Sequence, residues 1–342
     1  MRRTFASLII VFFVAFPASA QPQEEKAQIV EMTLNPAKSP EPKQKYQLLP
    51  KAQEQSDADA LPLYEKAVKS LPKDFQREQI SQWVKEPLNK LPREQVQSTL
   101  QQLGPTLQLV AQAAKCKQCN WPPFKPGTLP ENLSEYRKLA YVLALQARFQ
   151  IAKGQYDQAI STMQIGLAMA RHLGEAPTLI QGLVGVAIAG VMMNQAEELI
   201  QASNAPSLYG ALQDLPRPFI NLTKQIELEI ANIKKTGNPV LQKMFQEQLR
   251  PAHERTRITA KKLDRHIAAL QCIEAMRLYA AGHNGEFPKA LAAIAEVPIP
   301  GDPVTQKPFV YTRTGSKAVL EASAPEGATD KDAMRYELKL IE

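Results

Sequence analysis

The apolar residues of the chain recur mainly at the spacing of a helix, three or four positions apart. Residues 134–173 show this spacing most clearly, with two apolar stripes separated by Gly154. The spacing predicts a helix, a short turn and a return helix that packs against the first. Apolar positions at the same spacing run through residues 60–115 and 219–281. The pattern therefore predicts a mainly α fold built as an array of helical hairpins.

The most apolar predicted helix covers residues 178–200, and no polar side chain interrupts it between Leu183 and Met193. A helix that crosses a bilayer needs about 20 apolar residues, so this run is too short. We expect this helix to be buried on all sides and the mature chain to have no transmembrane span. Gly182, Gly185, Ala189 and Gly190 are expected to let neighbouring segments approach its backbone closely.

The pattern changes after Gly282, where glycine, proline and aspartate separate short runs of alternating polarity. Runs at residues 308–312, 318–322 and 334–341 predict strands. A turn at residues 314–316 would join the first two as a hairpin, and the third suits a further antiparallel strand. The sequence therefore predicts a long helix followed by a small three-stranded antiparallel sheet.

The N-terminal residues have the features of an export signal. Arg2 and Arg3 precede an apolar stretch at residues 5–16, and Ala18-Ser-Ala20 offers the small residues that a signal peptidase recognises. The apolar stretch is too short to anchor the chain in a membrane. We predict a signal peptide at residues 1–20 and export to the periplasm or cell envelope.

The rest of the chain divides into three predicted parts. Residues 21–59 contain proline at several positions among glutamine, glutamate and lysine, and bury too little apolar surface to offset the entropy of ordering. This part is therefore predicted to be a disordered tether. A helical-hairpin domain is predicted at residues 60–250, and the long helix with the small sheet at residues 251–342.

The chain is mildly basic, with 41 Lys and Arg against 34 Asp and Glu. In an exported protein this charge favours anionic lipids, cell-wall polymers or acidic proteins as partners, rather than nucleic acid. The most basic predicted helix stretch is residues 250–265, which indicates a solvated face or a contact with such a partner. Its cations are Arg250, Arg255, Arg257, Lys261, Lys262 and Arg265.

The chain has three cysteines, and two of them, Cys116 and Cys119, form a Cys-x-x-Cys pattern. The pattern follows a predicted helix, where the helix dipole has the wrong sign to activate a thiol. Asn120 stands where a c-type haem site needs histidine, and a second cysteine pair for zinc is missing. A structural disulfide between Cys116 and Cys119, or a pair of surface thiols, is favoured, with a redox or metal role as alternatives. Cys272 is expected to be a small core residue.

The sequence contains no recognisable catalytic or cofactor motif, such as a glycine-rich phosphate loop or a nucleophile elbow. The four histidines are His172, His253, His266 and His283. They lack the spacing of metal ligands and are expected on solvated helix surfaces, with His172 as a favourable charge at a helix C-terminus. We therefore expect no cofactor.

One helical hairpin resembles a tetratricopeptide repeat. Its matching residues, within 147–167, are Ala147, Gly154, Tyr156, Ala159 and Leu167. Residues 64–72 resemble the end of a second repeat. The sequence has no run of three units at the 34-residue period that a self-standing solenoid needs. The resemblance implies helical hairpins of atypical geometry.

Residues 265–341 resemble the globular half of a type II secretion pseudopilin. The matching features are the helix end at Tyr279, the turn at residues 283–288, the Pro-rich step through Asp302-Pro303 and the strand at residues 308–311. The resemblance implies a sheet packed on a long helix, and a part in a secretion or pilus-like system. Pseudopilins often bind calcium in this region, so a calcium ion shared by Asp330 and Asp332 is an alternative, but a polar turn is favoured there.

The layout as a whole is similar to exported helical envelope proteins of planctomycete-like bacteria. The similar features are Cys119-Asn-Trp121, the helix with Arg148, the hairpin and the C-terminal unit; they imply no known activity. We predict a non-catalytic scaffold or interaction protein with envelope proteins as partners. The alternatives are an accessory component of a secretion or pilus-like system, and an exported enzyme with a cleft between the helices and the C-terminal unit.

Overall fold

The structure of the protein is a computed structural model. The residues it describes are 29–37, 46–123, 130–235, 247, 250–326 and 328–341. The predicted signal peptide at residues 1–20 lies outside these ranges, as do residues 21–28 and 38–45 of the predicted tether.

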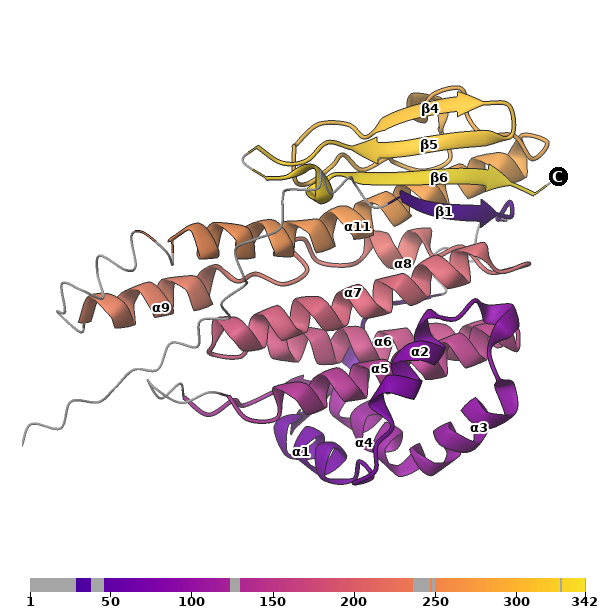
Figure 1. Cartoon of the computed structure of the whole chain (residues 1–342). Helices are drawn as coiled ribbons and strands as arrows, with labels where there is room; N and C mark the ends of the chain where they lie inside the picture. The colour runs from indigo at the N-terminus through magenta and orange to yellow at the C-terminus, as the bar shows by residue number, and fades with distance from the viewer. Residues whose placement is uncertain are drawn as a thin grey trace, which may run out of the picture.

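Three long helices run side by side through the centre of the molecule (Figure 1). They are α5 (Leu133–Ala152), α6 (Tyr156–Gly174) and α7 (Leu179–Gln201). Gly154 makes the turn between α5 and α6 with a φ of 70°, a left-handed conformation that glycine adopts at little cost. The prediction of a mainly α fold is confirmed, and α5 and α6 form a helical hairpin where the sequence predicts one.

Helices α6 and α7 pack closely because α7 has a glycine where they meet. A Cβ atom at Gly185 would lie 2.6 Å from the carbonyl oxygen of Ala170 and 3.0 Å from the nitrogen of Gly174. A side chain at this position would therefore push the two helices apart. The predicted close approach is confirmed at Gly185 but is wrong at Gly190, where an added Cβ would meet nothing within 4 Å.

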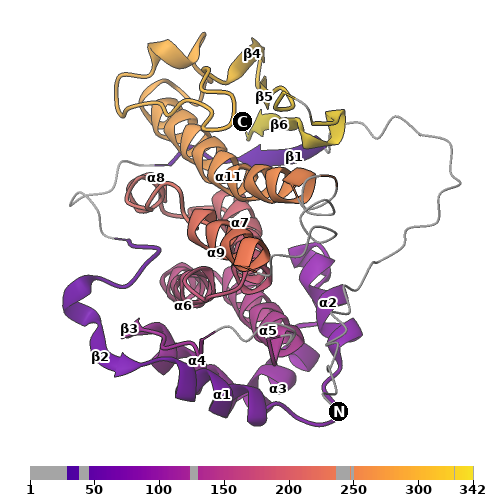
Figure 2. The same cartoon turned by 90° about the vertical axis from the view of Figure 1, so that its left-hand side faces the viewer.

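A layer of shorter elements covers one side of α5 and α6; most of it lies in the lower part of Figure 2, and α2 lies to the right of α5. It contains the helices α1 (Leu61–Lys69), α2 (Arg77–Lys85), α3 (Arg93–Gln102) and α4 (Gly104–Ala114), and the strands β2 (Ser56–Asp59) and β3 (Cys116–Gln118). A small apolar cluster around Trp83 joins α2 and α3 to α5. This cluster fixes α2 beside the central helices.

The other side of α7 carries the C-terminal half of the chain. It contains α8 (Tyr209–Gln213), α9 (Thr223–Lys235), the long helix α11 (Arg250–Gly282) and the strands β4 (Val310–Thr314), β5 (Lys317–Ala322) and β6 (Met334–Leu340). The sheet lies over α11, at the top of Figures 1 and 2. One apolar core continues from α7 through α11 to the buried face of the sheet, with Leu320 and Leu338 among its members.

The sheet has four strands in the order β1-β6-β5-β4. Its first strand, β1 (Ile29–Leu34), comes from the predicted tether and pairs in parallel with β6. Met32 and Leu34 of β1 are buried in the core, and this burial offsets the cost of ordering the strand. The predicted three-stranded antiparallel sheet is therefore wrong, because the sheet is mixed. The prediction of a disordered tether is wrong for residues 29–34 and 56–59.

Helix α7 is not buried on all sides, contrary to the sequence prediction. Among the described residues it is the helix that could cross a membrane by length and composition alone, and 61% of its most apolar window is buried in the protein. One stripe of α7 stays open, where Gly190 and Val191 are partly exposed and Asn194 is exposed. This stripe faces the site described next.

Candidate functional site

A groove of about 820 Å³ lies at the junction between the central helices and the sheet. We call it the junction groove; its lining comes from α2, α5, α7, α11, β1 and β6 and includes Gly190, Asn194 and Tyr336. Ligand sites typically measure about 300–1,000 Å³, so this space has the size of a ligand or short-peptide site. The absent side chain of Gly190 leaves open space over α7.

The β1 strand presents one of its edges to the groove. Backbone groups of alternate residues in a strand point to opposite edges. The Leu34 carbonyl accepts a hydrogen bond on the β6 side, whereas the Thr33 N–H donates to the Gln201 side chain on the other side, at 3.2 Å. The backbone N–H and C=O groups of Ile29 and Glu31 point to the same edge as those of Thr33. Both residues are exposed and line the groove. Among the described residues, no donor or acceptor meets their outward backbone groups.

A carboxylate joins three elements at the inner end of the groove. Oε1 of Glu197, on α7, accepts a hydrogen bond from the Tyr336 hydroxyl at 2.5 Å and lies 2.8 Å from Nε2 of His266, on α11. Burial, together with the nearby Glu197 charge, raises the pKa of Tyr336 well above its usual value. Tyr336 therefore keeps its proton as the donor to Glu197. The prediction of a solvated His266 is wrong, because this contact holds its ring.

A buried arginine lies on the α5 side of the groove. Arg148 is 3% exposed, donates to the Glu86 carbonyl and forms an ion pair with Glu198 at 2.9 Å. Its Nε has no partner among the described residues, and neither does Oε1 of Gln195 on the facing α7. Buried polar atoms normally have hydrogen-bond partners. In this part of the lining, the Arg148 Nε and the Gln195 Oε1 are two buried atoms whose hydrogen bonding is unsatisfied among the described residues.

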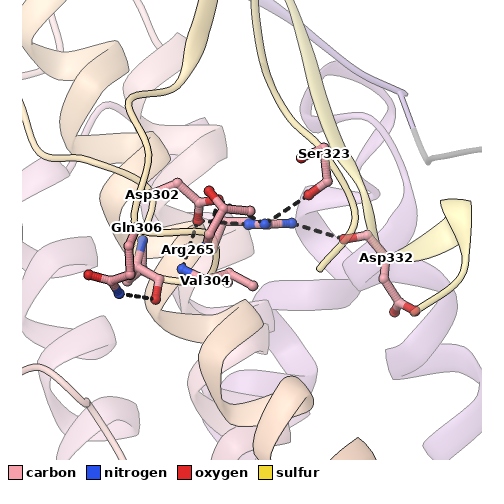
Figure 3. Close-up of polar contacts among 8 residues, drawn as sticks. Arg265, Asp302, Val304, Gln306, Ser323 and Asp332 are labelled. Carbon is pink, nitrogen blue, oxygen red and sulfur yellow. Dashed lines mark hydrogen bonds and ion pairs between the residues drawn. The ribbon is translucent and has the colours of Figure 1, made fainter. Parts of the chain in front are cut away.

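The guanidinium of Arg265 joins α11 to the C-terminal segments (Figure 3). It forms a forked pair with Asp302 at 2.9 and 2.8 Å, and it donates to the carbonyls of Ser323 and Asp332. Burial alone would raise the pKa of Asp302, but hydrogen bonds, chiefly from Arg265, outweigh it and lower that pKa. Asp302 is also a turn residue, because its carboxylate accepts a hydrogen bond from the Val304 N–H at 3.0 Å.

The Asp332 carboxylate is taken up by protein contacts. Lys262 donates to it at 2.8 Å, and Thr329 donates its backbone N–H and hydroxyl, each at 3.2 Å. Asp330 and Asp332 lie in a short 3-10 helix. The described residues contain no group of three His, Cys, Asp or Glu side chains placed to hold a metal ion. The geometry therefore gives the calcium hypothesis no support and matches the polar turn.

The basic stretch at the start of α11 divides into an exposed and a buried part. Arg255, Arg257 and Lys261 are exposed, as predicted for a solvated face. Arg265 is buried by its pairing with Asp302, so the prediction is wrong at that position. The positive surface of α11 therefore belongs to its first three turns.

His172 is a buried structural residue rather than a surface partner of the helix dipole. Its Nδ1 lies 2.9 Å from the Tyr64 hydroxyl, and its Nε2 lies 3.0 Å from the Cys116 carbonyl. Burial lowers the pKa of His172, so the ring is neutral at neutral pH. The sequence prediction for His172 is wrong, because Tyr64 and β3 close over the end of α6.

Cys116 and Cys119 are thiols in the structure, as is Cys272. Cys116 lies in β3, and an extended strand advances about 3.3 Å per residue. Disulfides need Cα atoms within about 7 Å, whereas three strand residues span roughly 10 Å. The disulfide stays a prediction, and forming it would require β3 to rearrange. Cys272 is fully buried, so its prediction as a core residue is confirmed.

The two remaining histidines differ in their surroundings. His253 is 5% exposed and lies 2.9 Å from Glu229, so the prediction of a solvated ring is wrong there. His283 is exposed and stacks on Tyr279, which confirms the prediction for this residue. Both lie outside the lining of the junction groove.

Comparisons with known protein families, with curated proteins and with solved structures found no match to this chain.

The junction groove was anticipated only as a possible cleft between the helices and the C-terminal unit. Its polar residues, such as Arg148, Glu197 and Tyr336, are far apart in the sequence and share no motif. One signal was available, because residues 30–34 alternate apolar and polar side chains as a half-buried strand does. This signal was hidden by the prolines around it.

Proposed function

We propose that the protein is an exported, non-catalytic interaction protein of the cell envelope, and that the junction groove receives its partner. The observation that carries the proposal is that the buried and partly buried polar side chains of the groove hold one another. Glu197 holds His266 and Tyr336, while Glu198 holds Arg148. Side chains fixed in this way shape a surface and set its charge, whereas covalent catalysis uses a nucleophile beside an available base.

The location in the envelope rests on the N-terminal sequence. Arg2 and Arg3, the apolar stretch at residues 5–16 and the small residues at 18–20 have the order of an export signal. The interaction part of the proposal rests on the groove, which is open at the surface and large enough for a short segment of a partner. The two parts of the proposal are tested separately.

Cross-linking in living cells tests the proposal. A photoreactive amino acid placed at Asn194, which is exposed in the groove, should capture a specific envelope protein. The same group at Lys289, which is exposed outside the groove lining, is the matched control and should not. Fractionation of the cells should place the cross-linked product in the envelope. Capture of the same proteins from both positions, or of none, would contradict the proposal.

A second candidate, an exported enzyme, is favoured by one specific contact. The Glu197 carboxylate lies 2.8 Å from Nε2 of His266, and a carboxylate that orients a histidine is common in general acid–base catalysis. Turnover of chromogenic ester and peptide substrates by the purified chain would be lost in His266→Gln and kept in His253→Gln. Absence of turnover in the parent chain, or equal turnover in both variants, removes this candidate.

A further inference from the structure

We infer that the junction groove binds an extended acidic peptide segment, which adds as a strand to the free edge of β1. The inference rests on the proposed function and names the chemistry of the partner. It draws on three features of the groove, namely an open strand edge, a floor left open at Gly190, and more exposed cations than anions along its walls. In strand addition, main-chain hydrogen bonds hold the peptide and the surrounding side chains select it.

The open edge is short and has a defined end. The outward backbone groups of Ile29 and Glu31 meet no donor or acceptor among the described residues. At Thr33 the edge is closed, because Gln201 accepts its N–H. An added strand would therefore pair with the first half of β1 and stop where α7 covers the second half. Unpaired strand edges bind other chains readily.

The floor beside this edge has room for a strand. Gly190, Val191 and Asn194 of α7 line the groove, and a Cβ atom at Gly190 would meet nothing within 4 Å. A longer side chain at Gly190 would fill the space that the peptide needs. Because the position is helical and uncrowded, such a side chain should not disturb the fold.

The charge of the walls selects an acidic occupant. Lys85 is exposed at the groove, whereas the half-exposed Lys262 is already paired with Asp332 at 2.8 Å. Arg255, also exposed, is one and two helix turns from Thr259 and Lys262, so it extends the same face of α11. Among the exposed lining residues, Glu31 is the opposing charge. Exposed cations that outnumber anions attract an acidic segment and repel a basic one.

The test pans a pool of end-capped random hexapeptides against the purified exported chain and measures the affinity of the enriched peptides. Enriched peptides should be rich in Asp and Glu. Gly190→Leu should abolish their binding, whereas Gly282→Leu, which also adds a side chain at an uncrowded helical position but outside the groove, should leave it unchanged.

A proline in β1 tests the strand edge itself. Glu31→Pro removes the outward N–H while leaving the β6 side of β1 paired, so affinity should fall about tenfold. Glu31→Ala removes the acidic side chain and keeps the N–H, so affinity should be equal or higher. Hydrogen exchange should show the Glu31 amide protected when peptide binds. Circular dichroism of each variant confirms that it is folded.

Several outcomes overturn the inference. They are the absence of enriched peptides, enrichment of basic ones, and binding that survives Gly190→Leu. If the Asn194 cross-link still captures a specific envelope protein in any of these cases, the proposed function stands and only the peptide chemistry is wrong. If the cross-link also captures nothing specific, both fail.

Discussion

Arg265 and Asp302 form a forked ion pair in which the two side chains are 2% and 0% exposed. The two hydrogen bonds measure 2.9 and 2.8 Å, and they join α11 to the loop that precedes β4. Because the same guanidinium also donates to the Ser323 and Asp332 carbonyls, one side chain holds three separate segments on the helix. The position of the sheet relative to the groove therefore depends on this contact.

Breaking this pair should destabilise the protein strongly. Arg265→Met leaves the Asp302 carboxylate buried without its partner, and breaking a buried pair costs about 3–5 kcal/mol. The double variant Arg265→Met with Asp302→Asn should lose less, because no charge is then left unpaired. Urea unfolding followed by circular dichroism measures the free energy of unfolding of each variant.

An exposed arginine on the same helix provides the control. Arg257 pairs with Glu254 at 3.4 Å, and both side chains are about half-exposed. Arg257→Met should change the free energy of unfolding by less than about 1 kcal/mol, as is usual for surface pairs. A loss at Arg265→Met that is no larger than the loss at Arg257→Met would show that the buried pair does not hold the sheet.

The helices were predictable because their signals are local. The turn at Gly154 and the apolar stripes around it place the α5–α6 hairpin within a single stretch of sequence. The strand β1 was not predicted, because its stability comes from pairing with β6, about 300 residues later in the chain. A short strand flanked by prolines carries little local information about such a partner.

The groove could not be predicted from the sequence for the same reason. Arg148, Glu197 and His266 lie in three separate helices whose local patterns do not indicate a site, and only the packing of α5, α7 and α11 brings them to one place. Buried charges such as Arg265 were expected on the surface, because charged residues are rarely buried without a partner. Their partners, Asp302 among them, lie in loops whose positions the sequence pattern does not reveal.

Two glycines of α7 should respond in opposite directions to the same substitution. Gly185→Ala places a Cβ 2.6 Å from the Ala170 carbonyl oxygen and should destabilise the protein. Gly190→Ala adds a methyl group where nothing lies within 4 Å, and should stabilise it by about 0.5–1 kcal/mol, because alanine favours a helix over glycine. Thermal unfolding of both variants tests the packing of α7. Equal shifts of the same sign would contradict the contact between α6 and α7.

The buried ring of His172 should make stability depend on pH. Burial lowers its pKa in the folded protein below the ordinary value of 6.5. As the pH falls below about 6.5, the unfolded chain binds a proton at this ring while the folded protein does not, so the free energy of unfolding decreases. The decrease ends once the pH passes below the folded pKa, where both states carry the proton.

Substitution separates this effect from that of other titrating groups. His172→Gln should flatten the pH dependence between about 6.5 and the folded pKa, while His283→Gln, at an exposed ring, should leave it unchanged. Urea unfolding at a series of pH values measures the slope. An unchanged slope in His172→Gln would mean that the ring is not buried in its neutral form.

The extended conformation of β3 predicts how the three cysteines react with an alkylating reagent. An extended backbone holds Cys116 and Cys119 too far apart for a disulfide, so all three cysteines should be alkylated when the purified chain is unfolded without reductant. In the folded protein, Cys119 is partly exposed and should react before the buried Cys116 and Cys272. Its reaction should still be slow, because burial raises the pKa of Cys119 and thiolate is the reactive form. Mass spectrometry counts the alkyl groups, and a single one on the unfolded chain would mean that a bridge has formed and that β3 has rearranged to allow it.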